Sequence, residues 1–181
     1  RLCYIPPTKE DYLQPTFNSI AKHDNRVVFK SQDLLFFYNP TEGSITSLKA
    51  PEYYKNIFKT KSHLFFNDFQ GGVYTIEGDD MTLFEDFKQI NSELVNVFEI
   101  TQNNYVFVFK NGQIWSKKGA IIKNVANLKS IVINAAIFNQ SKELVIGTNQ
   151  NGIYILDNQY KRKKTIIDTD GLQSNYVQRL Y

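Results

Sequence analysis

A period of 40 residues constrains the fold of this chain more than any other feature of its sequence. Gly72, Gly112 and Gly152 lie 40 residues apart, and each precedes a short apolar run. A second set with the same spacing consists of Ile57, Val97, Ile137 and Val177. A repeat of about 40 residues with four short strands is typical of a β-propeller blade. The sequence therefore predicts an all-β fold, a β-propeller segment of four blades with four antiparallel strands each. The three glycines should occupy equivalent turn positions.

The clearest copy of the repeat lies at the C-terminal end of the chain. Residues 144–146 form an apolar run, and Asn151-Gly152 then indicates a tight hairpin, because both residues accept a positive φ. Residues 153–156 form the returning strand, and residues 164–167 form a third, more polar strand. Asp170-Gly171 turns the chain again, and we expect Asp170 to accept hydrogen bonds from backbone amides in this turn.

The repeat divides the whole chain into consecutive units. The four blades are predicted at about residues 19–48, 56–84, 94–123 and 130–167. Residues 2–5 are predicted to be the outer strand of a preceding blade, and residues 177–181 the first, inner strand of a following blade. The whole chain is thus one domain, a propeller segment.

The two terminal strands bear on how the propeller closes. A closed propeller completes one blade from both ends of its chain, but here the two middle strands of that blade are absent. This favours part of a larger, about seven-bladed propeller, with a self-contained four-bladed ring as the alternative. Because an isolated segment would expose unpaired strand edges, we also expect a homodimer as one form of the chain.

Three short motifs in the fourth repeat resemble those of a known family. They are Val145-Ile146-Gly147-Thr148, then Gly152-Ile153-Tyr154 with Asp157, and finally Asp170-Gly171-Leu172 with Asn175 and Val177. Together they resemble the two-component regulator propeller repeat. The second repeat keeps Gly71-Gly72-Val73-Tyr74, and the first keeps only the rhythm of strands.

The resemblance implies a location and a role. Propellers of this family form the periplasmic sensor region of histidine kinases or DNA-binding transcription regulators in the inner membrane of Bacteroidetes-type bacteria, often followed by a triple-tyrosine domain. By resemblance, this chain is expected to be a periplasmic ectodomain that senses a ligand, often a carbohydrate fragment. Its signalling domains would lie in the same polypeptide.

Catalytic, metal and nucleic-acid sites are not indicated by the residues. No Ser-His-Asp set, paired catalytic carboxylates or glycine-rich phosphate loop is recognisable, and no cofactor is expected. His23 and His63 fall at different places in the repeat, so we expect surface or turn roles and no metal site. The net charge is only +3, and residues 161–164 alone carry four positive charges, which argues against a nucleic-acid surface. That basic run could dock a phosphate or an anionic surface, but a solvated loop tip is the simpler interpretation.

Candidate ligand-binding residues follow from where propellers gather their ligands. The residues that enter the predicted inner strands are Asn18, Asn56, Asn96, Ala136 and Tyr176. Asn side chains both donate and accept hydrogen bonds, so Asn56 and Asn96 could line a polar site; alternatively, they cap the turns between blades. Tyr53, Tyr54 and Tyr176 are candidates for stacking against a sugar. In contrast, Tyr74, Trp115 and Tyr154 recur in register, which indicates packing between blades.

The sequence is therefore compatible with three classes of function. A non-enzymatic sensor recognises a small molecule, such as an oligosaccharide, or a protein ligand. An interaction platform binds other proteins and has no small ligand. A lyase or glycosidase would need acid and base groups that converge in the central channel, and the sequence shows no obvious set. The sensor is favoured by the family resemblance, which is an inference from fold and family.

Overall fold

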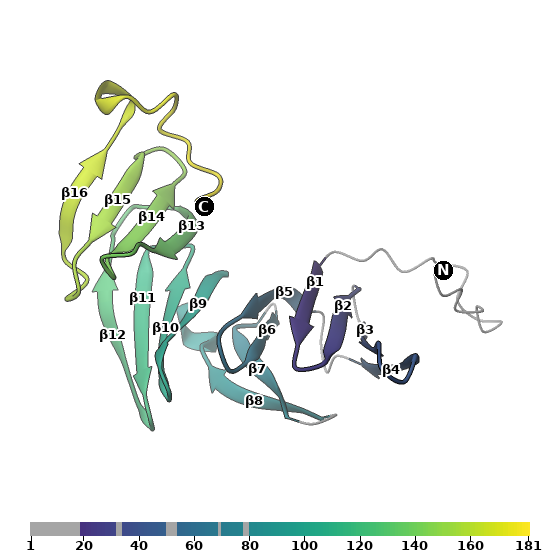
Figure 1. Cartoon of the computed structure of the whole chain (residues 1–181). Helices are drawn as coiled ribbons and strands as arrows, with labels where there is room; N and C mark the ends of the chain where they lie inside the picture. Colours follow the sequence, from purple (N-terminus) through teal and green to yellow (C-terminus); the bar gives the residue numbers. More distant parts are fainter. Residues whose placement is uncertain (1–18, 32–33, 50–53, 69, 78–79) are drawn as a thin grey trace.

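The structure is a computed structural model that describes residues 19–31, 34–49, 54–68, 70–77 and 80–181. Within these residues, the chain forms four antiparallel sheets of four strands each and two short 3-10 helices. Figure 1 shows the sheets following one another along the chain, with the C-terminal segment beside β13 and β14. The strand predicted at residues 2–5 lies outside the described residues.

Every sheet is built from four consecutive strands. The first consists of β1 (Ser19–His23), β2 (Arg26–Lys30), β3 (Leu34–Asn39) and β4 (Ser44–Lys49). The second consists of β5 (Tyr54–Lys59), β6 (Leu64–Asp68), β7 (Gly72–Glu77) and β8 (Asp80–Asp86). The third consists of β9 (Leu94–Thr101), β10 (Asn104–Phe109), β11 (Gln113–Lys118) and β12 (Ile121–Asn127). The fourth consists of β13 (Ile133–Phe138), β14 (Leu144–Thr148), β15 (Ile153–Leu156) and β16 (Arg162–Ile166). The 3-10 helices are η1 (Lys88–Ile90) and η2 (Asp168–Asp170).

The sheets are the blades of a β-propeller. In each one the strands pair in chain order, and the inner strands β1, β5, β9 and β13 lie next to one another in the same order. The predicted fold class is therefore confirmed. The total number of blades in the complete propeller stays a prediction.

Apolar clusters fill the space between neighbouring blades. Along β10, Val106 faces the cluster shared with blade four, whereas Phe107 faces the cluster shared with blade two. Successive side chains of a strand point to opposite faces, so a middle strand between two neighbours is apolar on both. This explains why a second strand can read as a continuous apolar run, as in β10, where residues 105–109 are all buried.

One aromatic position recurs in every blade. Phe37, Tyr74, Trp115 and Tyr154 each pair with a residue at the centre of the second strand of their blade. All four belong to the clusters between blades. The packing role predicted for Tyr74, Trp115 and Tyr154 is confirmed. Phe37 was missed because blade one lacks the glycine that marks this position in the sequence.

In blade two the glycine at the turn is Gly71, one residue before the Gly72 that the 40-residue spacing selected. The equivalent residues are Gly71, Gly112 and Gly152, whose φ angles of +99°, +88° and +70° all lie in the left-handed region. A side chain at any of the three positions would collide with a backbone carbonyl oxygen at the end of the blade. A Cβ would lie 2.9 Å from the oxygen of Phe87 for Gly71, 2.2 Å from that of Leu128 for Gly112, and 2.1 Å from that of Ile166 for Gly152. The prediction for Gly72 was therefore wrong. Gly72 pairs with Asp86 inside the β7–β8 ladder and has no positive φ.

In blade four the equivalent inner-strand residue is also one position away from the residue that the 40-residue spacing selected. Ile57, Val97 and Ala136 are equivalent, because each pairs with the central buried residue of the second strand. Ile137, which the 40-residue spacing selected, lies one position further along β13. The step from Val97 to Ala136 is 39 residues, and the turn before Gly152, which is one residue longer than the turn before Gly112, restores the 40-residue spacing of the glycines.

The C-terminal residues differ from the prediction. Residues 177–181 are not a strand, because within the described chain no second strand is available to pair with them. The segment nevertheless runs beside blade four, where the amide of Val177 donates to the carbonyl of Thr148 at 2.9 Å. Asp170 does form the predicted turn, since its Oδ2 accepts from the amide of Ile167 at 3.0 Å. The basic run is not a loop tip, because β16 begins at Arg162.

Candidate ligand-binding site at the inner strands

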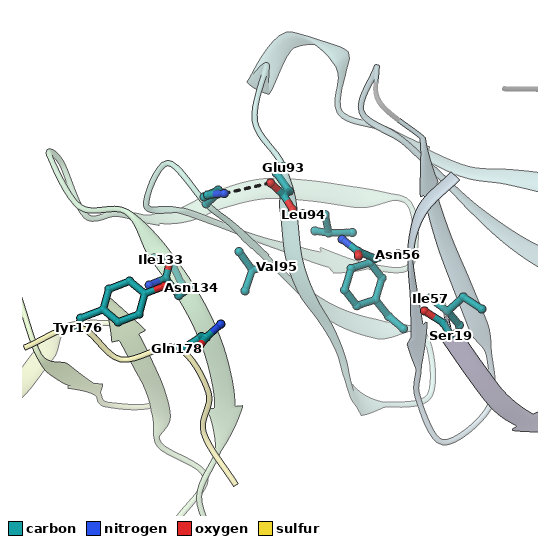
Figure 2. A pocket seen from close by; sticks show the side chains of 12 residues that line it. Ser19, Asn56, Ile57, Glu93, Leu94, Val95, Ile133, Asn134, Tyr176 and Gln178 are labelled. Carbon is teal, nitrogen blue, oxygen red and sulfur yellow. Dashed lines mark hydrogen bonds and ion pairs between the residues drawn. The ribbon is translucent and has the colours of Figure 1, made fainter. Parts of the chain in front are cut away.

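An open pocket of about 420 Å³ lies where the inner strands of the blades begin. Its walls come from β1, β5, β9 and β13, from the ends of the loops beside them, and from the C-terminal segment. Figure 2 shows the labelled side chains on separate segments, with Ser19 and Asn56 at one side, Val95 in the middle, and Asn134 with Tyr176 at the other side. Its volume is in the range of sites for small molecules, and its walls come from separate blades, so one ligand could touch several blades together.

A β-bulge places one extra residue of β5, β9 and β13 near this mouth. The register shifts lie between Tyr54 and Asn56, between Leu94 and Asn96, and between Ile133 and Ala135. In blades three and four the extra residues are Val95 and Asn134, and both line the pocket. A bulge bends its strand and aims a side chain out of the regular alternation. The bulges therefore supply pocket residues that the alternation of side chains along a strand does not predict.

The polar groups of the pocket are mostly uncharged. Asn56, Asn134 and Gln178 carry amides that can both donate and accept, and Ser19 adds a hydroxyl. The amide nitrogen of Asn134 donates to the carbonyl of Val177 at 3.3 Å, which leaves its oxygen as a further acceptor. Figure 2 shows Tyr176 on the same side of the pocket as Asn134 and Gln178. The Tyr176 side chain is 53% exposed, so its ring is available to a ligand.

One ion pair stands at the edge of the pocket. Lys110 Nζ lies 3.2 Å from Glu93 Oε2, and the two side chains are 48% and 27% exposed. The amide of Lys110 also donates to the carbonyl of Glu93 at 2.8 Å, which fixes the loop after β10 beside the start of β9. A partly exposed pair of this kind stabilises a protein by at most about 1 kcal/mol. The two charges can therefore exchange their contact for a ligand at little cost.

The predicted ligand residues have different places in the structure. Asn56 and Tyr176 line the same pocket. Asn96 instead links blades three and four, because its Nδ2 donates to the carbonyl of Ala136 at 3.0 Å. Tyr53 lies outside the described residues, and Tyr54 begins β5 with a side chain that is not described. That Asn56 and Tyr176 bind a ligand stays a prediction.

Sequence reasoning missed several lining residues. Asn18 lies outside the described residues, and the residue of β13 equivalent to Asn96 is Ala135 rather than Ala136. Glu93 and Lys110 carried no signal, because their contact depends on the blade geometry rather than on a motif. Asn134 is aimed by a bulge, which only an alignment of the inner strands could have indicated.

A second polar cluster joins blades two and three at the other end of the inner strands. Glu99 accepts from the amide and hydroxyl of Ser62, both at 2.8 Å, and from the hydroxyl of Thr60 at 2.9 Å. Burial raises the pKa of Glu99, but these hydrogen bonds outweigh it and hold the pKa below the ordinary value. The hydroxyl of Tyr105 lies 3.2 Å from Nδ1 of His63. Burial, together with the nearby Glu99 charge, raises the pKa of Tyr105.

The two histidines do not form a metal site in the described part of the chain. His63 stacks on Phe65, with ring centroids 5.5 Å apart. His23 ends β1 rather than lying in a turn, and burial lowers its pKa. Among the described residues, no group of three or more His, Cys, Asp or Glu side chains could hold a metal ion. The same residues include no helix of the length and apolar character that spanning a membrane requires.

Comparisons with known proteins give the fold rather than an identity. No family profile and no curated protein matches the chain. The chain is similar to two structures of the extracellular domain of BT4673 from B. thetaiotaomicron, described as a one-component system and as a hybrid two-component system. The TM-scores are 0.71 and 0.72 at 16% identity, with 97% of this chain and 26% of the other covered. The chain thus spans about a quarter of the length of these neighbours.

A third neighbour comes from a different class. Virginiamycin B lyase from Staphylococcus aureus aligns with a TM-score of 0.62 at 14% identity, over 81% of this chain and 54% of the enzyme. These identities support the β-propeller fold alone. The two extracellular domains are nevertheless in agreement with the family that the sequence motifs resemble.

Proposed function

We propose that this chain is part of a ligand-sensing β-propeller in the periplasm, within a bacterial signal-transduction regulator. The observation that carries the proposal is the pocket, whose walls come from several blades and from the C-terminal segment. A ligand that touches several blades favours the arrangement in which all its contacts are made, and so shifts the population of that arrangement. The extracellular neighbours and the motifs of the fourth repeat support the location and the regulatory role.

The ligand that best fits the pocket chemistry is a carbohydrate fragment. Amide and hydroxyl groups suit a ligand rich in hydroxyl groups, because each can donate or accept. The exposed ring of Tyr176 offers an apolar face against which a sugar can stack. The signalling domains would lie in the same polypeptide, and the role is non-enzymatic.

A thermal-shift screen with a panel of oligosaccharides tests this proposal. A binding oligosaccharide should raise Tm, since it binds the folded state alone. Asn56→Ala and Tyr176→Ala should weaken binding at least about tenfold, as expected when a hydrogen bond or a stacking contact worth about 1.4 kcal/mol is lost. Matched controls are Asn158→Ala and Tyr181→Ala, at exposed residues outside the pocket, which should bind normally.

The alternatives give different results in the same assay. Stabilisation by no oligosaccharide, together with tight capture of a protein partner, would identify an interaction platform. Cleavage or elimination products after incubation with an oligosaccharide would identify an enzyme. Unchanged binding in both pocket variants would place the site elsewhere on the propeller.

A further inference from the structure

The outermost strand of blade four carries more positive charge than the outer strand of any other described blade. Lys161 and the first three residues of β16 are cationic, and all four are exposed. In contrast, β4 and β12 each contain one lysine, and β8 contains none. A single charged residue already hinders a sheet edge from pairing with another chain. Protection of the edge therefore does not account for four consecutive cations.

The exposure of this strand does not depend on which blade follows it, because the outer strands form the perimeter of a propeller. Blade three shows this directly. Blade four packs against it, and Lys123 of β12 is nevertheless exposed. Lys123 is equivalent to Lys164, since each pairs with the residue that follows the recurring aromatic of its blade. We therefore expect the basic run to stay at the surface of a longer propeller.

The turn before β16 holds the run on a fixed base. Oδ1 of Asp157 accepts from the amides of Gln159 and Lys161 at 2.8 and 2.9 Å. The side chain of Tyr160 packs against the apolar cluster between blades three and four. The backbone that carries the cations is thus tied to the blade, and only the long side chains remain free to move.

A second turn adds a fifth cation. Lys163 Nζ lies 2.6 Å from Glu143 Oε1, so the turn between β13 and β14 lies beside β16, and the exposed Lys142 belongs to that turn. Both nearby carboxylates are already engaged, Asp157 in its own turn and Glu143 by Lys163 and the amide of Asn139. The surface therefore keeps a net positive charge. We refer to it as the basic rim, formed by Lys142, Lys161, Arg162, Lys163 and Lys164.

The basic rim lies at the end of blade four that is remote from the pocket. β13 begins at Ile133, which lines the pocket together with Asn134, and it ends at Phe138, directly before the turn that carries Lys142. Figure 1 shows β16 at the margin of the molecule, with β14 and β15 between it and β13. A surface that binds the rim would therefore leave the pocket open.

We propose that the basic rim docks the propeller onto a membrane surface that carries anionic phospholipids. Lysine ammonium groups on flexible stems bind phosphates without a fixed geometry, which suits a fluid array of headgroups. An acidic peptide added as a further strand would fit less well, because a β-bulge between the residues paired with Ile155 and Leu156 distorts the edge. This docking goes beyond the proposed function and requires no ligand in the pocket.

Co-sedimentation with phospholipid vesicles tests the docking. At about 0.1 M salt the chain should bind vesicles made of equal amounts of phosphatidylglycerol and phosphatidylcholine, and it should not bind vesicles of phosphatidylcholine alone. At about 1 M salt it should be released, because screening then acts within about 3 Å. Failure of the chain to bind the anionic vesicles, or capture of an acidic protein or polysaccharide instead, would overturn the membrane partner and leave the proposed function intact.

A pair of charge variants tests whether the rim is the docking site. The test variant combines Lys161→Gln, Arg162→Gln, Lys163→Gln and Lys164→Gln. It should bind anionic vesicles at least about a hundredfold more weakly, since each cation near such a surface strengthens binding about fivefold. The matched control loses the same charge at four exposed lysines outside the rim, namely Lys22→Gln, Lys59→Gln, Lys61→Gln and Lys129→Gln. It should keep most of the binding, and equal losses in both variants would overturn the rim.

Two further measurements separate docking from folding and from the pocket. The test variant should keep the Tm of the wild type and should bind any oligosaccharide found by the thermal-shift screen with normal affinity. If its Tm falls, Lys161→Gln with Lys164→Gln gives the same test, because the contacts of Arg162 with Tyr154 and of Lys163 with its carboxylate partner stay in place. This double variant should lose more than about tenfold in vesicle affinity. Unchanged vesicle affinity would overturn the rim.

Discussion

The junction between blades two and three differs in kind from the junction between blades three and four. The first is rich in aromatic rings, with Phe65, Tyr105 and Phe107 at its centre, and polar bonds from Glu99 close one end of it. The second is mainly aliphatic, and a side-chain amide, Asn96 to the carbonyl of Ala136, crosses it. Two neighbouring interfaces of one repeat can therefore keep the same backbone and use different chemistry. The difference predicts that single side chains contribute more to stability at the first junction than at the second.

Truncating the core should give the largest effect. Phe107→Ala removes a ring with no exposed surface from the junction of blades two and three, and should lower the free energy of unfolding by about 3–5 kcal/mol. Val106→Ala, on the opposite face of β10, should cost about 1–2 kcal/mol, because it removes two methyl groups from the other junction. Urea denaturation measures both. Equal losses would show that the two junctions do not differ in packing.

Removing the side-chain hydrogen bonds that cross each junction should have a smaller effect on stability. Glu99→Ala deletes the acceptor for three donors and should cost about 1–3 kcal/mol, because part of the donor set is shielded from water. Asn96→Ala should cost about 1 kcal/mol at the other junction, where the donor to the carbonyl of Ala136 and the acceptor for the amide of Val97 are lost. Thermal unfolding of both variants checks the ranking. A greater cost for Asn96→Ala would reverse the comparison.

The junction of blades two and three should weaken in acid. The hydrogen bonds hold the pKa of Glu99 below its ordinary value in the folded chain. A lowered folded pKa contributes stability that is present above the unfolded value of about 4.3 and is lost as the pH falls through the folded pKa. The stability difference between the wild type and Glu99→Gln should therefore shrink below about pH 4. Unfolding curves at several pH values test this, and a constant difference down to pH 2 would contradict it.

The smallest effect is expected at an ion pair on the edge of the same junction, where both side chains are partly buried. Lys117 Nζ lies 2.7 Å from Glu85 Oε2 and 5.4 Å from the ring centre of Phe84. Lys117→Met keeps much of the side-chain packing and removes the charge, so it should cost at most about 1 kcal/mol. The loss should diminish in 1 M salt, because salt screens the ion pair. A salt-independent loss would assign the effect to packing alone.

The sequence was sufficient for the fold because each blade buries both faces of its middle strands. Residues 105–109 are apolar without interruption, and a glycine with a left-handed φ follows after a two-residue turn. These features are local and repeat, so the pattern in the sequence reveals them. The register was predicted less well, since Gly72 and Ile137 each miss their equivalent position by one residue. A turn can gain one residue without harm to the sheet, and a fixed period does not follow such changes.

The candidate site depended on information that no single segment contains. Asn56 and Tyr176 were selected because they enter inner strands, and the structure brings them to one pocket. Asn96 was selected by the same rule, yet its amide is used between blades. The pairing of Lys110 with Glu93 depends on how β9 and β10 pair within blade three, and the aim of Asn134 depends on the bulge in β13. Neither follows from residue type and spacing.

The bulges in the inner strands have a consequence for engineering. The residue that a bulge inserts has no partner in the ladder, so its identity is not constrained by strand pairing. Val95 and Asn134 are therefore natural positions for a combinatorial library that redirects the pocket to new ligands. Such a library would vary one side chain in each of two blades. Because Val95 also packs against the apolar cluster between blades three and four, its variants have to be selected for folding yield together with binding preference.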